Sequence, residues 1–105
     1  MESMKVVGES ELDDVFFERA DAHIDLSNKQ TAGAEIGRVS SSMMYATARF
    51  NSWVSACGFN DGSEMAEARA DTIEYFVKQY RLMLEDNLDD YIHNFDRYMK
   101  RSEER

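Results

Sequence analysis

The sequence contains no proline and only five glycines among its 105 residues. Both residue types interrupt regular backbone structure, so their scarcity favours long, uninterrupted helices. The single cysteine, Cys57, excludes an intramolecular disulfide and a zinc site built from several thiolates of one chain. No apolar run approaches the ~20 residues that span a bilayer, and the first nine residues lack the apolar stretch of a signal peptide. We therefore expect no membrane segment and no targeting peptide.

Basic residues are also scarce relative to acidic ones. The chain has 12 Lys and Arg against 21 Asp and Glu, which gives a formal net charge of -9. Binding to phosphate requires a basic patch, so this balance argues against DNA, RNA or an anionic membrane as a partner. The length is sufficient for one domain with its own core and too short for two.

Apolar residues recur with a helical period in the first half of the chain. The first predicted helix begins at Ser10, in a capping-box-like sequence, and ends near Gln30, with an acidic stripe opposite its apolar face. That apolar face consists of Leu12, Phe16, Ala20, His23 and Ser27. The second predicted helix begins at the serines of residues 40–42 and ends before Gly58. It carries one charge, Arg49, so we expect it to form the buried centre of the fold.

The third periodic segment, residues 64–101, is too long for a compact domain of this size. As a straight helix it would extend for roughly 57 Å, whereas a domain of this length has a radius of gyration of about 13 Å. Its apolar residues follow a 4-3-4 spacing that shifts by one residue between Leu84 and Leu88, so we expect a kink near Asn87. The sequence thus predicts an all-α fold, a small bundle of three to four helices with a long C-terminal helix. A mobile tail at 1–9 precedes a single helical domain at 10–101.

Residues able to carry catalysis or bind a metal are few. His23 lies on an apolar face, where a histidine satisfied by one hydrogen bond is the simplest interpretation. Asp90 and His93 have the spacing of a helical di-metal motif, but the second such motif is missing, because Ala20 stands three residues before His23. Cys57 has no basic neighbour in sequence to activate its thiol, so we expect a small buried side chain. We predict no catalytic residue, no metal site and no cofactor.

Two arginines lie where the sequence predicts burial. Arg19 is on the apolar side of the first helix, and Arg49 lies beside Tyr45 on the second. A buried guanidinium requires carboxylate partners, so structural ion pairs are one interpretation. The other is a pocket for a small anionic ligand, lined by Arg19, Arg49, His23 and Tyr45.

The C-terminal half carries more aromatic and methionine side chains than two shorter helices are able to cover. Tyr91, Phe95 and Tyr98 are the candidate interface residues on this segment. A symmetric dimer is the commonest way for one patch to cover its own copy. We therefore expect a homodimer, with a further protein partner as an additional candidate, and a non-enzymatic interaction module. The alternative function is the binding of a small molecule or anion through Arg19 and Arg49.

Three segments carry a resemblance to a known family: Phe17–Asp21, Met44–Asn51 and Glu85–Ile92. In these segments, and over about residues 16–99, the sequence resembles a set of short proteobacterial proteins grouped as domain of unknown function 3144. The resemblance implies a bacterial, cytoplasmic and helical protein. It implies no activity and no catalytic residue.

Overall fold

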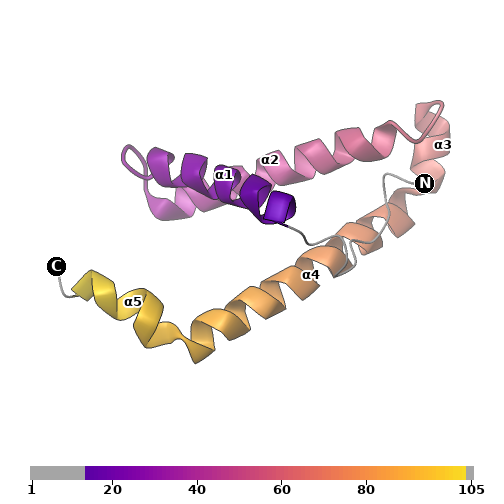
Figure 1. Ribbon diagram of the computed structural model, residues 1–105. Helices are drawn as coiled ribbons and strands as arrows, with labels where there is room; N and C mark the ends of the chain where they lie inside the picture. The colour runs from indigo at the N-terminus through magenta and orange to yellow at the C-terminus, as the bar shows by residue number, and fades with distance from the viewer. Residues whose placement is uncertain (1–13, 104–105) are drawn as a thin grey trace. The chain divides into compact units, whose positions relative to one another are not determined.

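The structure is a computed structural model that describes residues 14–103, all of whose regular elements are helices (Figure 1). The five helices in that range are α1 (Asp14–Gln30), α2 (Ile36–Ala56), α3 (Gly62–Glu67), α4 (Arg69–His93) and α5 (Phe95–Glu103). The predicted all-α class is confirmed, while the expected tail and the helix start at Ser10 lie outside the described residues. The chain divides into two compact units, the first ending at Met65 and the second beginning at Ala66.

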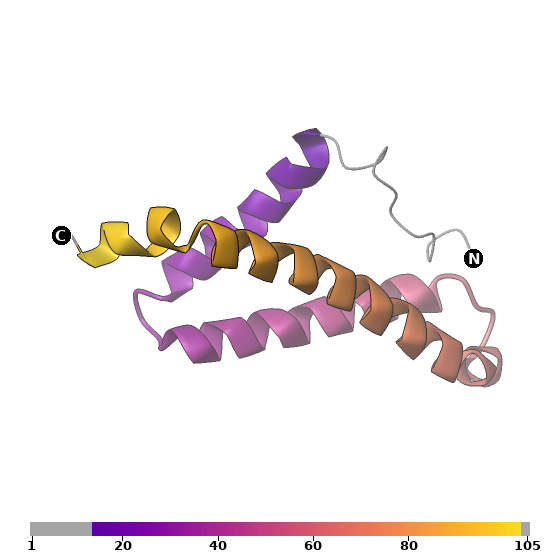
Figure 2. The ribbon, with the colours of Figure 1, turned by 90° about the horizontal axis from the view of Figure 1, so that it is seen from below.

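In the first unit, α1 and α2 form a helical hairpin (Figure 2). α1 ends at Gln30, as its sequence predicts, and the Thr31 hydroxyl donates to the Asn28 carbonyl at 2.6 Å just beyond it. The residues of α1 that are half-buried, Phe16, Ala20 and Ser27, all belong to the predicted apolar face. The Ser27 hydroxyl reaches across the hairpin to the Met43 sulfur at 3.4 Å.

α2 begins at Ile36, four residues before the predicted start at Ser40. Gly33 and Gly37 predict a loop over residues 31–38. Gly37 instead lies in the first turn of α2, where Glu35 is the N-cap residue and the Glu35 carbonyl accepts from the amides of Arg38 and Val39. A glycine costs roughly 1 kcal/mol against alanine inside a helix, which is too little to prevent a helix from forming around it. The local glycine was therefore a weaker signal than the helical period that follows.

The expectation that α2 is the buried centre is wrong. Its buried residues are Val39 and Ser55, near its two ends. The large side chains of Tyr45, Phe50 and Trp53 are each more than 60% exposed. One neighbouring helix covers only one side of a cylinder, and α1 is the main neighbour of α2 in this unit. The large apolar side chains of this helix, which carries a single charge between residues 40 and 57, therefore lie largely on the surface.

The turn after α2 is organised by side chains that the sequence identified. The Asp61 carboxylate accepts from the Glu64 amide at 2.8 Å, and the Glu64 carboxylate accepts from the Asn60 amide at 2.9 Å. The sequence leaves two capping arrangements open here, Asp61 with Glu64 or Ser63 alone, and these reciprocal bonds show the first of them at the start of α3. Gly58 follows the helix end as predicted, although no described glycine adopts a positive φ. Cys57, at the C-cap, is exposed rather than buried.

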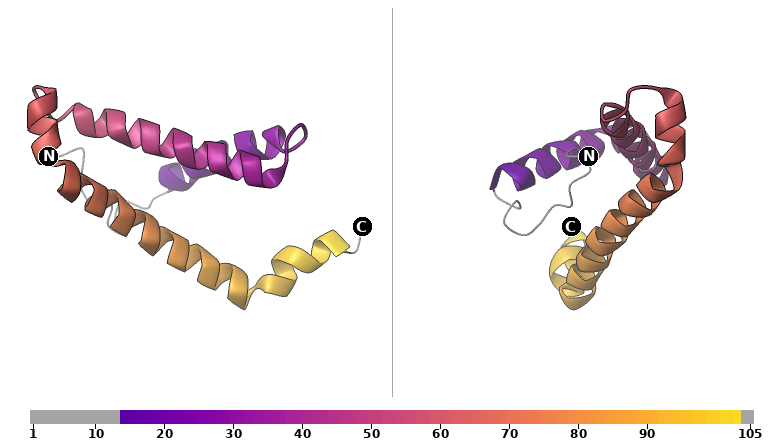
Figure 3. Two further views of the ribbon diagram at one scale, coloured as in Figure 1. Left: turned by 180° about the vertical axis from the view of Figure 1, so that it is seen from behind. Right: turned by 90° about the vertical axis from the view of Figure 1, so that its right-hand side faces the viewer.

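In the second unit, α4 runs for 25 residues and continues through Asn87. The Asn87 amide donates to the Met83 carbonyl at 2.8 Å, within the helix itself, so the expected kink at Asn87 is wrong in position. The interruption lies seven residues later, at Asn94, where α5 turns away from α4 (Figure 3, left). A second short interruption, at Ala68, separates α3 from α4 and was not predicted.

Candidate functional site

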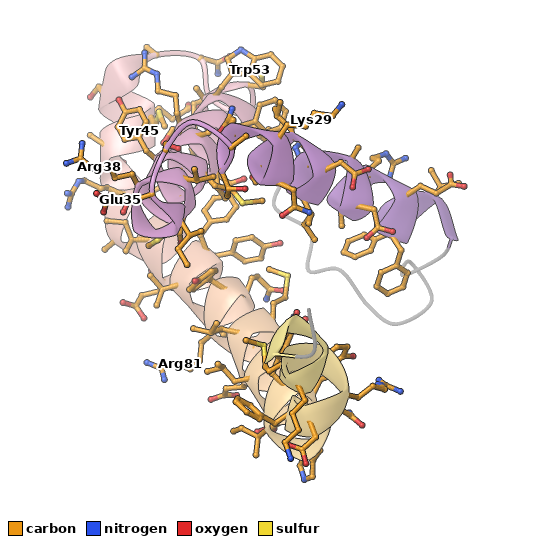
Figure 4. The ribbon with its side chains drawn as sticks, turned by 90° about the vertical axis from the view of Figure 1, so that its left-hand side faces the viewer. Lys29, Glu35, Arg38, Tyr45, Trp53 and Arg81 are labelled. Atoms are coloured by element: carbon orange, nitrogen blue, oxygen red, sulfur yellow. The ribbon has the colours of Figure 1, made fainter. Side chains whose placement is uncertain are left out.

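The four residues predicted to bind a ligand lie on the two helices of the hairpin. Arg19 and His23 are on α1, and Tyr45 and Arg49 are on α2, and all four are exposed. Figure 4 shows Tyr45 on the surface of α2. Within the described residues, no hydrogen bond or ion pair links any two of these side chains. The expected burial of Arg49 and the expected core position of His23 are therefore wrong, and their role in ligand binding stays a prediction.

Asp90 and His93 do not interact with each other as their spacing suggested. The His93 ring nitrogen Nδ1 lies 2.7 Å from the Asp89 carbonyl oxygen, within the same helix. Across the described part of the chain, no group of three or more His, Cys, Asp or Glu side chains is arranged to hold a metal ion.

Asp90 instead anchors the junction between α4 and α5. Its carboxylate accepts from the Tyr98 hydroxyl at 2.8 Å and from the Asn94 side-chain amide at 2.9 Å. The Arg97 guanidinium donates to the same Tyr98 hydroxyl at 3.1 Å. The Tyr98 ring packs on the Tyr91 ring, with centroids 4.5 Å apart and planes inclined by 31°. These contacts hold the first turns of α5 in a fixed direction against the end of α4.

The predicted interface residues all lie at this junction. Tyr91 is on the last turns of α4, Phe95 is the first residue of α5, and Tyr98 lies one turn later. Tyr91 and Phe95 are about half exposed, whereas Tyr98 is more covered because of its contacts with Tyr91 and Asp90. The prediction identified three neighbouring aromatic residues, but it missed Asp90 and Asn94. An acid and a tyrosine eight residues apart, on either side of an asparagine, were the signal that could have revealed them.

An apolar stripe runs along α4 toward this junction. We define the stripe as Ile73, Val77, Tyr80, Leu84, Leu88 and Tyr91. At 100° per residue these positions share one side of the helix. Each of them is between 41% and 52% exposed, and α4 has no buried residue. The stripe is therefore a regular set of six exposed apolar side chains along one side of α4.

Charged side chains lie beside the stripe and farther round the helix. Arg81 lies next to the stripe and Glu85 about 100° from its centre, whereas Lys78 and Asp89 lie toward the opposite side, and all four are exposed. Figure 4 shows Arg81 extending away from α4. Within the described residues neither Lys78 nor Arg81 forms an ion pair, whereas Lys100 and Asp96 on α5 do, at 3.6 Å.

No helix in the part of the chain that the structure describes has both the length and the apolar character to cross a bilayer.

Comparison with known proteins identifies the family. The model of the family described as protein of unknown function (DUF3144) matches residues 16–92, from the first turn of α1 to the last turn of α4. No curated protein matches the sequence. The fold is similar to the NMR structure of the protein NB7890A from Shewanella sp, with a TM-score of 0.70 and 36% sequence identity. That similarity covers 82% of this chain and 92% of the Shewanella chain. The chain therefore belongs to the DUF3144 family of proteins of unknown function.

Proposed function

We propose that this protein is a non-enzymatic helical module that self-associates as a homodimer through the apolar stripe of α4. The observation that carries the proposal is that α4, a helix of 25 residues, has no buried residue although its stripe is apolar. Most helices in proteins are stabilised by packing of an apolar face rather than by intrinsic propensity. The stripe therefore requires a covering surface.

The size of the stripe favours a protein surface as its cover. Burying one large apolar side chain stabilises a fold or complex by roughly 1.5–3 kcal/mol, so leaving six of them half exposed is a substantial loss. Exposed apolar patches of several hundred Å² are typical of sites of protein interaction. The aromatic residues Tyr91 and Phe95 extend the surface at the junction with α5, and aromatic side chains are enriched in interfaces.

Sedimentation equilibrium of the full chain over a wide concentration range tests this proposal. We expect the mass to rise from 12.1 kDa toward twice that value as concentration increases. A mass that stays at 12.1 kDa at every concentration would contradict the proposal, and would instead favour cover of the stripe by the chain's own helices.

Two leucines of α4 provide a matched pair of variants. Leu84 lies in the stripe and Leu82 lies on the opposite side of the helix, and the two are 41% and 47% exposed. Because neither side chain is buried, aspartate at either position should leave the fold intact. We expect Leu84→Asp to raise the dimer Kd by at least about tenfold, since it places a charge in an apolar interface, and Leu82→Asp to leave the Kd within about threefold. Equal effects of the two substitutions would exclude the stripe as the interface.

A further inference from the structure

We propose that the junction between α4 and α5 is a conformational switch with two states. In the bent state, which the structure shows, α5 turns away from α4 at Asn94 (Figure 3, left). In the second state α4 and α5 join into one continuous helix from Arg69 to Glu103. The change lies within one chain, so it requires no second copy and goes beyond the proposed self-association.

The two helices are separated by one residue of non-helical backbone. α4 ends at His93, α5 begins at Phe95, and Asn94 between them has φ -117° and ψ 27°. Helical values are about -63° and -42°, so rotations of about 55° in φ and 70° in ψ at this residue join the two helices. Neither proline nor glycine occurs after Gly62, and asparagine is a moderate helix former. No residue type in this segment therefore prevents the continuous helix.

The bent state has contacts that a continuous helix does not allow. The rings of Tyr91 and Tyr98 have centroids 4.5 Å apart, whereas a continuous helix separates residues seven positions apart by about 10.5 Å along its axis. Both side chains lean in the same direction along a helix, so their rings would not meet. The Tyr98 hydroxyl donates to the Asp90 carboxylate at 2.8 Å, although a continuous helix places these residues about 12 Å apart along its axis. Both contacts therefore depend on the bend.

The continuous helix has backbone hydrogen bonds that the bent state lacks. In a helix each amide donates to the carbonyl four residues earlier, so Phe95 would donate to Tyr91 and Asp96 to Ile92. Among the described residues, neither of these two bonds is present in the bent state. Straightening thus exchanges side-chain contacts for backbone hydrogen bonds.

The contacts on the two sides of this exchange are of similar strength. The Asp90 carboxylate accepts from the Asn94 side-chain amide at 2.9 Å as well as from Tyr98, and both bonds are exposed. An exposed hydrogen bond replaces a bond to water, so its net contribution to stability is small. The same applies to the backbone bonds that straightening would form. Two discrete arrangements of similar stability make the junction bistable.

The switch changes the length of the apolar stripe. Phe95 and Tyr98 follow Tyr91 by four and seven residues, as Val77 and Tyr80 follow Ile73. Ile73 and Tyr91 are 18 residues apart, which corresponds to about five full turns of helix. In the continuous helix Phe95 and Tyr98 therefore lie on the same side as the stripe and extend it, whereas the bend removes them from its line.

A double variant and a matched control test the switch in the full chain by NMR. The bend variant, Asp90→Ala with Asn94→Ala, removes the side-chain bonds of the bend and introduces two good helix formers. The control variant, Asn87→Ala with Asp89→Ala, removes the same two residue types from α4. The Asn87 amide donates to the Met83 carbonyl within the helix, so its loss leaves the contacts of the bend in place.

The two states predict opposite changes at the junction. In the bend variant we expect hydrogen exchange of the Phe95 and Asp96 amides to slow by about tenfold or more, because each gains a helical bond. The nuclear Overhauser contact between the rings of Tyr91 and Tyr98 should disappear. The control variant should show neither change. Faster exchange throughout α5 of the bend variant would show that α5 frays without the bend, and would overturn the switch, as would a ring contact that persists.

Relaxation dispersion on the unaltered chain tests whether the continuous helix is populated in the native protein. We expect exchange at the amides of Asn94, Phe95 and Asp96, with chemical-shift differences that match those between the unaltered chain and the bend variant. Flat dispersion profiles at these three residues would overturn the second state. Because both experiments report on one chain, their failure would leave the proposed self-association intact.

Discussion

Replacing Ser55 with alanine is expected to stabilise the protein. Ser55 is fully buried on α2, and its hydroxyl oxygen has no hydrogen-bond partner among the described residues. Leaving a buried hydroxyl without a partner costs roughly 1–3 kcal/mol, because water is lost and nothing replaces it. Alanine removes that oxygen, leaves the rest of the side chain in place, and is also the better helix former, by up to about 0.5 kcal/mol. We therefore expect the free energy of unfolding to rise by about 1.5 kcal/mol.

The matched control for this variant is Ser52→Ala, three residues earlier on the same helix. The Ser52 hydroxyl is exposed and donates to the Ala48 carbonyl at 2.8 Å, so its removal changes helix propensity without relieving a buried polar group. Urea unfolding followed by circular dichroism, at one fixed protein concentration, gives both values. For a domain of this size, 1.5 kcal/mol corresponds to a rise in Tm of about 6–12 °C. If Ser55→Ala is less stable than Ser52→Ala, the hydroxyl has a partner in solution and the reasoning fails.

Three further substitutions test local features of the helices. Gly37→Ala should stabilise α2 by about 0.5 kcal/mol in urea unfolding, because an added Cβ meets no atom within 4 Å and alanine restricts the unfolded chain; a loss of stability would show that the backbone there needs glycine. Asp61→Ala should destabilise the protein by about 1 kcal/mol, because the Glu64 amide loses its cap, and an unchanged urea midpoint would show that water serves equally well. Tyr98→Phe removes the bond to Asp90 and should accelerate amide exchange in α5 while leaving the hairpin amides unchanged; unchanged exchange in α5 would show that ring packing alone fixes the bend.

The features that the sequence predicted correctly are those that neighbouring residues determine. The end of α1 at Gln30 and the cap formed by Asp61 and Glu64 each depend on contacts between residues within a few positions of one another. The helical period of α4 likewise follows from the apolar pattern alone. The stripe that carries the proposed function is therefore recognisable from the amino-acid sequence by itself.

The features that the sequence predicted wrongly are those that depend on what covers a surface. Arg49 and Tyr45 lie on an apolar helix, and the sequence suggested that such a helix is central. Burial depends on how many neighbours a helix has, which periodicity does not specify. For the same reason the predicted ligand residues Arg19 and His23, which lie on the apolar side of α1 by sequence, are exposed in the structure.

The position of the interruption in the C-terminal helix is a further feature that residue type alone does not predict. Asn87 and Asn94 are the same residue type on the same predicted helix, and only the second ends it. Both side-chain amides donate to the backbone carbonyl four residues earlier, and the Asn94 amide donates in addition to the Asp90 carboxylate, which also accepts from the Tyr98 hydroxyl. The hydrogen bond between Asp90 and Tyr98 joins residues eight positions apart. That separation in sequence is longer than helix-capping patterns cover, but shorter than that of a typical tertiary contact.

The bend at Asn94 is determined by residues that lie close to it in the sequence. The bend contains neither proline nor glycine, and the hydrogen bonds and ring contact that set its direction lie between Asp90 and Tyr98. The match to the family ends at Ile92, just inside this segment. Because the bend is encoded locally, it is a transferable unit: grafted onto the end of another exposed helix, these residues would redirect it without a helix-breaking residue.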